Sequence, residues 1–286
     1  MNMDVERIIE CVKDTLITAG STFSDDKIRA YERAISSETN VRAKWVLETI
    51  LENGIIAKKN RSPLCDDTGI PHLLLEIGNS RTLAGAQIDA IYEGVRQGLR
   101  TLPGRPMAID GNDCERLDQS GGLNEDSGAV EPAPLLIHHS DENNRMRLHI
   151  LMFGGGPAIR GRTYRVFHKH SMETVKDELV KWAVESIAQL GCSPCTLTIG
   201  IGRSHYEAAS LMLKAQAFGN HDIQNEIERE MTDRVNESNI GALGLHGKTT
   251  VLSTFMMIGP QRASGVRIVC MRPSCCFEPR HAFVDL

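Results

Sequence analysis

The sequence lacks several features that would assign it to a class at once. Its 286 residues contain no run of about 18 apolar residues, the length of a membrane-spanning helix. Aromatic residues make up only 5%, which leaves few rings to stack on nucleic-acid bases. The formal net charge is -5, so the chain lacks the basic excess of a nucleic-acid-binding domain. We therefore expect neither membrane nor nucleic acid as a partner.

An export signal is also missing. Residues 1–7 contain no basic start that leads into an apolar core, as a secretory signal would require. We therefore expect a cytoplasmic protein. In that compartment the eight cysteines stay reduced and are available as metal ligands instead of pairing as disulfides.

Apolar periodicity predicts helices and strands that alternate along the chain. Helices are expected over 4–58 (two or three), 83–99, 171–190, 204–217 and 221–238, and strands over 72–77, 134–138, 146–153, 197–201, 251–257 and 265–271. No internal repeat and no low-complexity linker interrupts this pattern. The sequence therefore predicts a single mixed α/β domain over residues 1–286.

Two segments stand outside the predicted elements. Residues 101–131 are rich in glycine and proline and predict a long loop excursion, a kind of loop that is usually functional or mobile. Residues 160–170 carry several arginines, lysine and histidine and predict a basic turn. Such a turn holds an anion or a partner chain, or is simply a solvated loop.

A dense group of reactive side chains occurs in the segment 63–69. Cys65, Asp66, Asp67 and Thr68 place a thiol, two carboxylates and a hydroxyl within four residues, on an expected turn between a helix and a strand. Thiolate is a soft metal ligand and carboxylates are candidates for proton transfer. An ordinary turn with a small buried cysteine is the structural alternative.

Two glycine-rich stretches are candidate ligand-binding segments. Gly154, Gly155 and Gly156 follow a predicted strand, where they either allow a ligand close to the backbone or simply end the strand. The stretch 241–250 resembles a phosphate loop, but Ala242 stands where the first glycine is needed and a helix precedes it instead of a strand. Nucleotide binding is therefore not expected.

The remaining cysteines allow a second kind of metal site. Cys192 and Cys195 have the spacing of half a zinc site, with Cys275 and Cys276 as its other half, although adjacent cysteines rarely bind one tetrahedral ion together. Cys192 and Cys195 are also spaced as a redox pair, but they lead into a strand instead of opening a helix.

Four segments in order resemble one family. They are 63–69, the triple glycine with Gly161 and Arg162 after it, 193–202, and 247–250 followed by 276–282. This set is similar to the α subunit of the iron–sulfur hydro-lyases, the class I fumarases and L(+)-tartrate dehydratase, from about residue 5 to 282. The resemblance implies the fold of the N-terminal cluster-binding domain of class I fumarases.

The resemblance implies a 4Fe-4S cluster held by Cys65, Cys195 and Cys276. Cys276 is preferred as third ligand over Cys275 and Cys270 because Arg280 follows it where the family has an arginine. Three thiolate ligands leave one iron open to act as a Lewis acid on the hydroxyl of a small hydroxy-dicarboxylate, tartrate-like or malate/fumarate-like.

The resemblance also implies roles for the substrate pocket. Asp67 matches the catalytic aspartate, with proton transfer or orientation of the hydroxyl as its role. Arg105 stands forty residues after Cys65, at the place of an arginine that binds a substrate carboxylate. Further substrate-binding residues implied in this way are Asp66, Thr68, Gly154, Gly155 and Gly156.

Departures from the family pattern leave alternatives open. Asp66 stands where the family usually has glutamine, and residues 259–264 contain Arg262 but no histidine. These changes indicate a changed substrate, reduced activity, or a non-catalytic relative that senses iron or a ligand. The family completes its active site with a second domain, fused or separate. A chain that ends at Leu286 implies a separate β-type subunit as partner.

Overall fold

The computed structural model describes residues 4–102, 104–105 and 107–286. It confirms a mixed α/β fold, with helices and two mixed sheets. The chain divides into two compact units, each described here by itself. Unit 1 comprises 4–22, Gly54–Gly154 and Arg280–Leu286, and unit 2 comprises Phe23–Asn53 and Gly155–Pro279. The single domain expected over 1–286 stays a prediction.

Unit 1 is built on a four-stranded sheet. In sheet order the strands are β2 (Leu136–His139), β1 (Ile70–Ile77), β3 (Met146–Phe153) and β8 (His281–Asp285). β1 runs parallel to β2, and β3 is antiparallel to both β1 and β8. Two helices pack together beside this sheet, α1 (Val5–Ser21) and α4 (Gly85–Thr101).

The core of unit 1 follows from helical spacing. Ile8, Val12 and Leu16 recur along one face of α1 and are fully buried, because they meet the apolar face of α4 and the sheet. Gly94 of α4 lets the two helices approach closely, since a β-carbon there would lie 2.7 Å from the carbonyl oxygen of Ile9.

Unit 2 is built on a second four-stranded sheet. In sheet order the strands are β4 (Arg162–Phe167), β7 (Val266–Ser274), β5 (Cys195–Gly202) and β6 (Val251–Ile258). β5 runs parallel to β6, and β7 is antiparallel to β4 and β5. The helices of this unit are α2 (Asp25–Ser37), α6 (Gly155–Arg160), α7 (Met172–Leu190), α8 (His205–Phe218) and α9 (Glu226–Asn236), with a 3-10 turn η2 (Ala242–Gly244).

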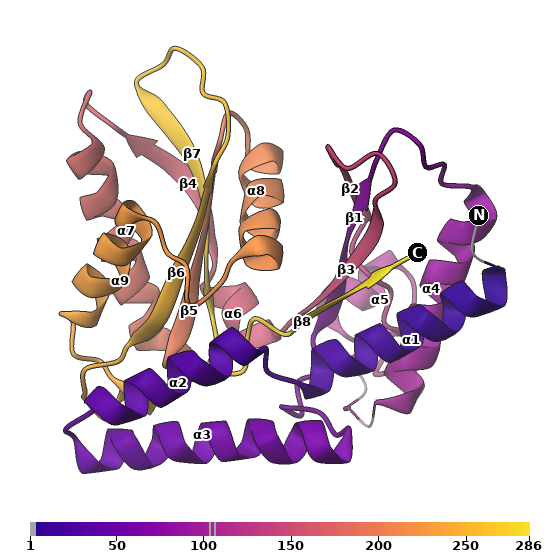
Figure 1. Cartoon of the computed structure of the whole chain (residues 1–286), viewed down its shortest axis with the longest axis horizontal. Coiled ribbons are helices and arrows are strands. Elements are labelled where there is room, and N and C mark those ends of the chain that lie inside the picture. The colour runs from indigo at the N-terminus through magenta and orange to yellow at the C-terminus, as the bar shows by residue number, and fades with distance from the viewer. Residues whose placement is uncertain (1–3, 103, 106) are drawn as a thin grey trace. The chain divides into compact units, whose positions relative to one another are not determined.

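Helices cover both faces of the second sheet. Figure 1 shows α8 on one face, with α7 and α9 on the other. All eight residues of β5 are consequently buried. Gly200 of β5 allows α8 to lie directly on the strand, because a β-carbon there would meet the carbonyl oxygen of Ala208 at 2.1 Å. The helix α3 (Val41–Asn60) begins in unit 2 and ends in unit 1.

Two strands differ from the sequence prediction. The expected basic turn within 160–170 contains the strand β4, because Thr163, Tyr164, Val166 and Phe167 are β-branched or aromatic and pair with β7. The last strand expected from the sequence is 265–271, but a further strand, β8, follows and pairs with β3. Both strands are stabilised by partners distant in the sequence.

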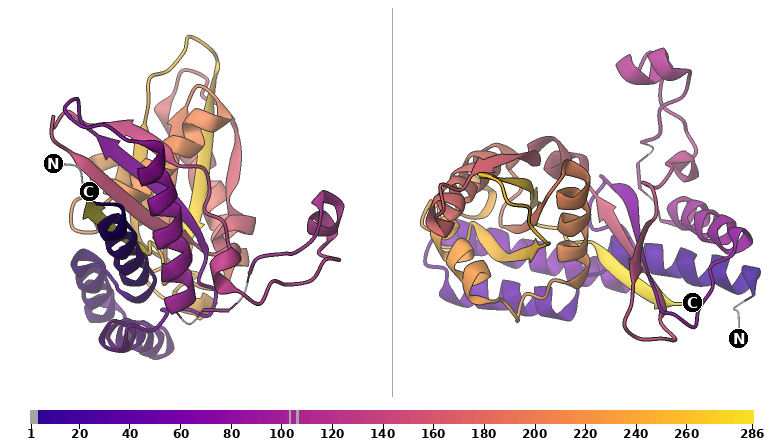
Figure 2. Two further views of the ribbon diagram at one scale, coloured as in Figure 1. Left: turned by 90° about the vertical axis from the view of Figure 1, so that its right-hand side faces the viewer. Right: turned by 90° about the horizontal axis from the view of Figure 1, so that it is seen from above.

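The excursion predicted over 101–131 is largely irregular in its described part, with two short helices. These are α5 (Asp113–Asp118) and the 3-10 turn η1 (Ser127–Ala129). The Asn112 side chain caps α5 by accepting from the backbone N–H of Cys114 at 2.9 Å. No residue of α5 is buried, and Figure 2 shows α5 away from the sheet of its unit.

Among the described residues, we find no helix with both the length and the apolar character needed to cross a membrane.

Candidate functional site

The loop that carries Cys65 joins α3 to β1 in unit 1. The Cys65 thiol is half-buried and lies 3.5 Å from the carboxylate of Asp66. The backbone N–H of Leu64 anchors the loop by donating to the carbonyl of Gly20 at 2.9 Å. Gly69 ends it with φ +87°, a left-handed conformation that glycine adopts without steric cost. The sequence therefore correctly places Cys65 to Thr68 on a turn before a strand.

Asp66 pairs with Arg105, the arginine predicted to bind a substrate carboxylate. One guanidinium nitrogen of Arg105 lies 3.5 Å from the Asp66 carboxylate, and both side chains are largely exposed. The Cys65 thiol, the Asp67 backbone N–H and the Arg105 charge together lower the pKa of Asp66. Asp66 is therefore ionised at neutral pH, and the extra carboxylate noted in the sequence has a cation beside it.

Thr68 presents a buried hydroxyl to the same loop. Its side chain is 3% exposed, and its Oγ1 atom has no hydrogen-bond partner in the part of the chain that the structure describes. Gly104 lies against it, since a β-carbon at Gly104 would be 1.6 Å from this oxygen. The hydroxyl is therefore covered by Gly104, and the substrate-binding role of Thr68 stays a prediction.

Arg280, from the C-terminal segment of unit 1, also fixes this loop. The sequence alone did not predict this role. This arginine is 2% exposed, and its guanidinium donates to the backbone carbonyl of Asp67. Gly69 makes room for it, because a β-carbon there would lie 2.7 Å from the guanidinium. The family resemblance already matched Arg280 to a family arginine, and this match was the one sign in the sequence that Arg280 has a specific role. Asp67 itself is half-buried.

Four cysteines come together in unit 2. Cys195 is the first residue of β5 and is fully buried, and Cys276 follows β7 and is 3% exposed. The backbone N–H of Cys276 donates to the carbonyl of Cys192 at 2.8 Å. Cys275 is near enough to affect the ionisation of the other three thiols. We call Cys192, Cys195, Cys275 and Cys276 the cysteine group.

The environment of the cysteine group favours neutral thiols. Burial and the neighbouring Cys275 raise the pKa of Cys195. A hydrogen bond with Cys275 and burial raise the pKa of Cys276 well above its ordinary value. Metals and iron–sulfur clusters bind the thiolate form, so their positive charge has to compensate for this burial. Two buried thiols, Cys195 and Cys276, are soft donors of the kind that hold an iron–sulfur cluster.

Buried polar side chains fix the backbone around Cys276, and the sequence did not reveal them. The hydroxyl of Tyr31 on α2 donates to the carbonyl of Cys276 at 2.6 Å. The ammonium of Lys27, one turn earlier, donates to the carbonyl of Glu278 at 2.7 Å. Arg272 pairs with the carboxylate of Glu278 at 3.0 Å, and both side chains are buried. The segment that carries Cys276 is thus held from several sides.

The structure separates Cys270 from this group. Cys270 lies within β7, paired with Thr163 of β4 and Gly200 of β5. Burial raises the pKa of its thiol, and its charged neighbour is Arg272 instead of another cysteine. Among the three candidates for the third cluster ligand, Cys275 and Cys276 lie with Cys195.

Other predicted site residues are divided between the units. Cys65 belongs to unit 1, and Gly154 directly follows β3 there. Gly155 and Gly156 begin α6 in unit 2. Over 4–102, 104–105 and 107–286, no three His, Cys, Asp or Glu side chains are arranged to hold one metal ion. The predicted ligand and substrate residues therefore stay predictions.

The fold and these residues define a class that comparison with known proteins confirms. The family model for fumarate hydratase (Fumerase) matches residues 9–285. The chain therefore belongs to the fumarate hydratase family and is a hydro-lyase. This finding confirms the resemblance inferred from the four sequence segments.

Two relatives with known family names are similar to this chain. It is 28% identical over 289 residues to "Putative L(+)-tartrate dehydratase subunit alpha" of Methanocaldococcus jannaschii, covering 96% of each chain. It is 24% identical over 264 residues to "Putative fumarate hydratase class I" of Geobacillus stearothermophilus. That alignment covers 87% of this chain and 49% of the relative, so the chain spans about half of that protein's length.

Proposed function

We propose that this chain is the cluster-bearing α subunit of a hydro-lyase that dehydrates a small hydroxy-dicarboxylate reversibly, with tartrate-like and malate/fumarate-like acids as the substrate class. The observation that carries the proposal is the burial of Cys195 and Cys276 together in unit 2. Membership of the fumarate hydratase family supports the reaction type.

The proposed cofactor is a 4Fe-4S cluster with Cys65, Cys195 and Cys276 as ligands. Bound there, a cluster with one open iron supplies a Lewis acid for the substrate hydroxyl. Burial raises the pKa of Cys195, and a hydrogen bond with Cys275 together with burial raises the pKa of Cys276, so loading the site has to release protons.

The chain's own residues have distinct proposed roles at the substrate. Arg105 binds a substrate carboxylate, which must displace or share the Asp66 carboxylate now beside it. The buried Thr68 hydroxyl hydrogen-bonds a substrate oxygen. Asp67 transfers a proton or orients the hydroxyl, while Arg280 holds its backbone in place. Gly154, Gly155 and Gly156 keep their proposed role as substrate-binding residues.

A separate β-type subunit is the proposed partner. The Methanocaldococcus relative, matched over 96% of both chains, carries the name of an α subunit. The longer Geobacillus relative is matched over about half its length, as expected where both parts are fused in one protein. In this proposal the partner supplies further substrate-binding groups and the base, so the chain alone is catalytically incomplete.

The test is activity of the complete enzyme. The chain is produced with the β-type subunit of its source, reconstituted anaerobically with iron and sulfide, and assayed against a panel of hydroxy-dicarboxylates and unsaturated dicarboxylates. We expect turnover of at least one acid, and loss of turnover when either subunit is omitted. A reconstituted complex with a full cluster and no activity on any acid of the panel contradicts the enzyme and favours the non-catalytic relative.

The cysteine group favours one second candidate, a zinc site formed by Cys192, Cys195, Cys275 and Cys276. All four belong to unit 2, and Cys275 affects the ionisation of the other three thiols. Metal analysis distinguishes the two candidates. One zinc per chain without iron or sulfide supports zinc, whereas about four irons with matching sulfide support the cluster.

A further inference from the structure

The strand β4 is an edge of the sheet in unit 2. The sheet order is β4-β7-β5-β6, so β4 pairs with β7 on one side and with no strand of the described chain on the other. In an antiparallel pair, about half of the backbone N–H and C=O groups point away from the partner strand. This edge therefore offers backbone donors and acceptors to an added strand.

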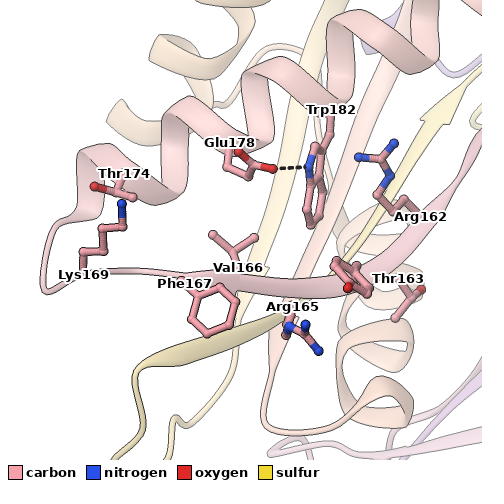
Figure 3. Close-up of a pocket in the computed structure, with 10 residues that line it drawn as sticks. Arg162, Thr163, Arg165, Val166, Phe167, Lys169, Thr174, Glu178 and Trp182 are labelled. Atoms are coloured by element: carbon pink, nitrogen blue, oxygen red, sulfur yellow. Dashed lines mark hydrogen bonds between the residues drawn. The ribbon is translucent and has the colours of Figure 1, made fainter.

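A pocket of about 660 Å³ follows this edge. Its lining includes every residue of β4, and Figure 3 shows Arg162 and Trp182 above the strand with Arg165 and Phe167 below it. Successive side chains of a strand point to opposite faces, so the residues that line this pocket come from both faces of the edge strand. We call it the β4 groove, lined by Arg162–Phe167, Lys169, Thr174, Glu178 and Trp182.

The β4 groove is positively charged. Arg162, Arg165 and Lys169 line it, and Glu178 is its one acidic residue. Glu178 accepts a hydrogen bond from the Trp182 indole N–H at 2.7 Å. Arg162 pairs with Glu185 at 3.5 Å, whereas no ion pair joins Arg165 or Lys169 to any acid in the described part of the chain. The groove therefore favours an acidic ligand.

Exposed aromatic rings accompany these cations. Tyr164 is 50% exposed and Phe167 is 57% exposed, although both are large apolar side chains. The Arg165 guanidinium lies over both rings, 5.2 Å and 5.5 Å from their centroids. Arginine and aromatic side chains are enriched in protein interfaces relative to the rest of the surface. The combination points to a protein segment as ligand.

A built turn places Lys169 at the end of the groove. Lys169 and His170 have φ values of +48° and +55°, which are uncommon for residues other than glycine. His168 holds them, because its Nδ1 accepts from the backbone N–H of His170 at 2.9 Å. Its Nε2 lies 2.7 Å from the carbonyl oxygen of Ser264, to which it donates. The position of Lys169 is therefore fixed by the surrounding structure.

We propose that the β4 groove binds an acidic segment of another polypeptide in extended conformation, which pairs with β4 as a fifth strand. Backbone hydrogen bonds supply affinity, and Arg165 and Lys169 select acidic side chains. The same cations disfavour pairing between two copies of β4, since each copy would add the positive charges of Arg165 and Lys169 to one ribbon. This surface is independent of the proposed reaction.

The test uses Trp182 as the reporter. The sequence has two tryptophans, so Trp45→Phe leaves Trp182 alone, and Trp182 lines the groove. A capped peptide with Glu-Val repeated three times is titrated and Trp182 emission is followed. We expect a saturable change in emission. A control peptide with Lys-Val repeated three times should bind at least tenfold more weakly, because its charge is reversed. A Glu-Val peptide N-methylated on alternate residues should also bind at least tenfold more weakly, because it cannot pair as a strand.

Matched variants locate the site. The double reversal Arg165→Glu with Lys169→Glu should weaken Glu-Val binding at least tenfold, while Lys58→Glu with Lys59→Glu, two exposed cations outside the groove, should not. Circular dichroism of each variant checks the fold. Equal binding of the N-methylated peptide, or no loss in the groove variant, overturns the proposal. The proposal is also overturned if the chain forms dimers that the groove variant abolishes. In that case a second copy of the chain would occupy the groove.

Discussion

In unit 1 the guanidinium of Arg105 lies 3.5 Å from the carboxylate of Asp66, a residue that stands where the family usually has glutamine. The arginine proposed to bind substrate is therefore already next to an acid of its own chain. Hydrogen bonding by Cys65 and the charge of Arg105 keep the pKa of that acid low, so it remains a competitor at neutral pH. Substrate binding has to overcome this pair.

We expect Asp66→Gln to lower KM for the dicarboxylate by about two- to fivefold, because the exposed pair contributes modestly and its loss frees Arg105. The measurement is steady-state kinetics of the reconstituted complex. Asp118→Asn, in the exposed helix α5, is the matched control and should leave KM unchanged. A KM that rises in Asp66→Gln contradicts the proposed role of Arg105.

Tyr31 stabilises the segment that carries Cys276. Tyr31→Phe removes a 2.6 Å hydrogen bond to the carbonyl of Cys276 within a fully buried environment. We expect the free energy of unfolding to fall by about 1–3 kcal/mol, the usual cost of an unsatisfied buried group. Urea unfolding of the cluster-free chain measures it. An unchanged midpoint would show that another group satisfies this carbonyl.

The buried pair of Arg272 and Glu278 predicts a non-additive mutant cycle. Arg272→Met leaves the fully buried Glu278 carboxylate without this cation and should cost about 3–5 kcal/mol. Adding Glu278→Gln should restore part of the loss, because it removes the buried negative charge that has lost its Arg272 partner. The exposed pair of Arg100 and Asp126 is the control, and Arg100→Met should change stability little. Additive losses in the buried cycle would contradict the account.

His221 predicts a loss of stability in mild acid. Burial lowers its pKa to about 3, with further lowering by the charge of Lys27, against 6.5 when exposed. The unfolded chain binds the proton more readily, so the contribution is complete above pH 6.5 and declines as the pH falls towards 3. We expect a loss of about 2 kcal/mol between pH 7 and pH 5.

The matching variant is His221→Gln, which lacks the titrating group. It should be less stable at pH 7, because His221 Nδ1 contacts the Ser253 hydroxyl at 3.0 Å, but its stability should change less between pH 7 and pH 5. Urea unfolding of both proteins at pH 7 and pH 5 measures this difference in the pH dependence of stability. The same pH dependence in both proteins would assign the acid sensitivity elsewhere, with His149 as the next candidate because burial lowers its pKa too.

The sequence predicted those elements whose cause is local. The helix at 171–190 is one example, since its cap Ser171 accepts from the backbone N–H of Thr174 three residues later at 3.3 Å. The strands β4 and β8 escaped prediction because their pairing partners, β7 and β3, lie far along the chain. Short strands beside charged residues carry little periodic pattern of their own.

In the candidate site, too, features with a local cause were predicted and features that depend on distant residues were not. The motif from Cys65 to Thr68 was visible because its side chains are consecutive in the sequence. Tyr31 was not, because it acts on a backbone carbonyl 245 residues away. A tyrosine on a helix gives no indication that its hydroxyl is buried and bonded. The membership of the hydro-lyase family could be recognised from spacing, whereas the residues that hold the site together required the fold.

The most direct test of the proposed function is iron and sulfide analysis of the anaerobically reconstituted chain. The wild type is compared with Cys65→Ser, Cys195→Ser and Cys276→Ser, and with the control Cys114→Ser, an exposed cysteine of α5. We predict about four irons with matching sulfide in the wild type and the control, and loss of the cluster in the other three variants. A wild type that binds zinc but no iron, or a Cys65→Ser variant that keeps its full cluster, would contradict it.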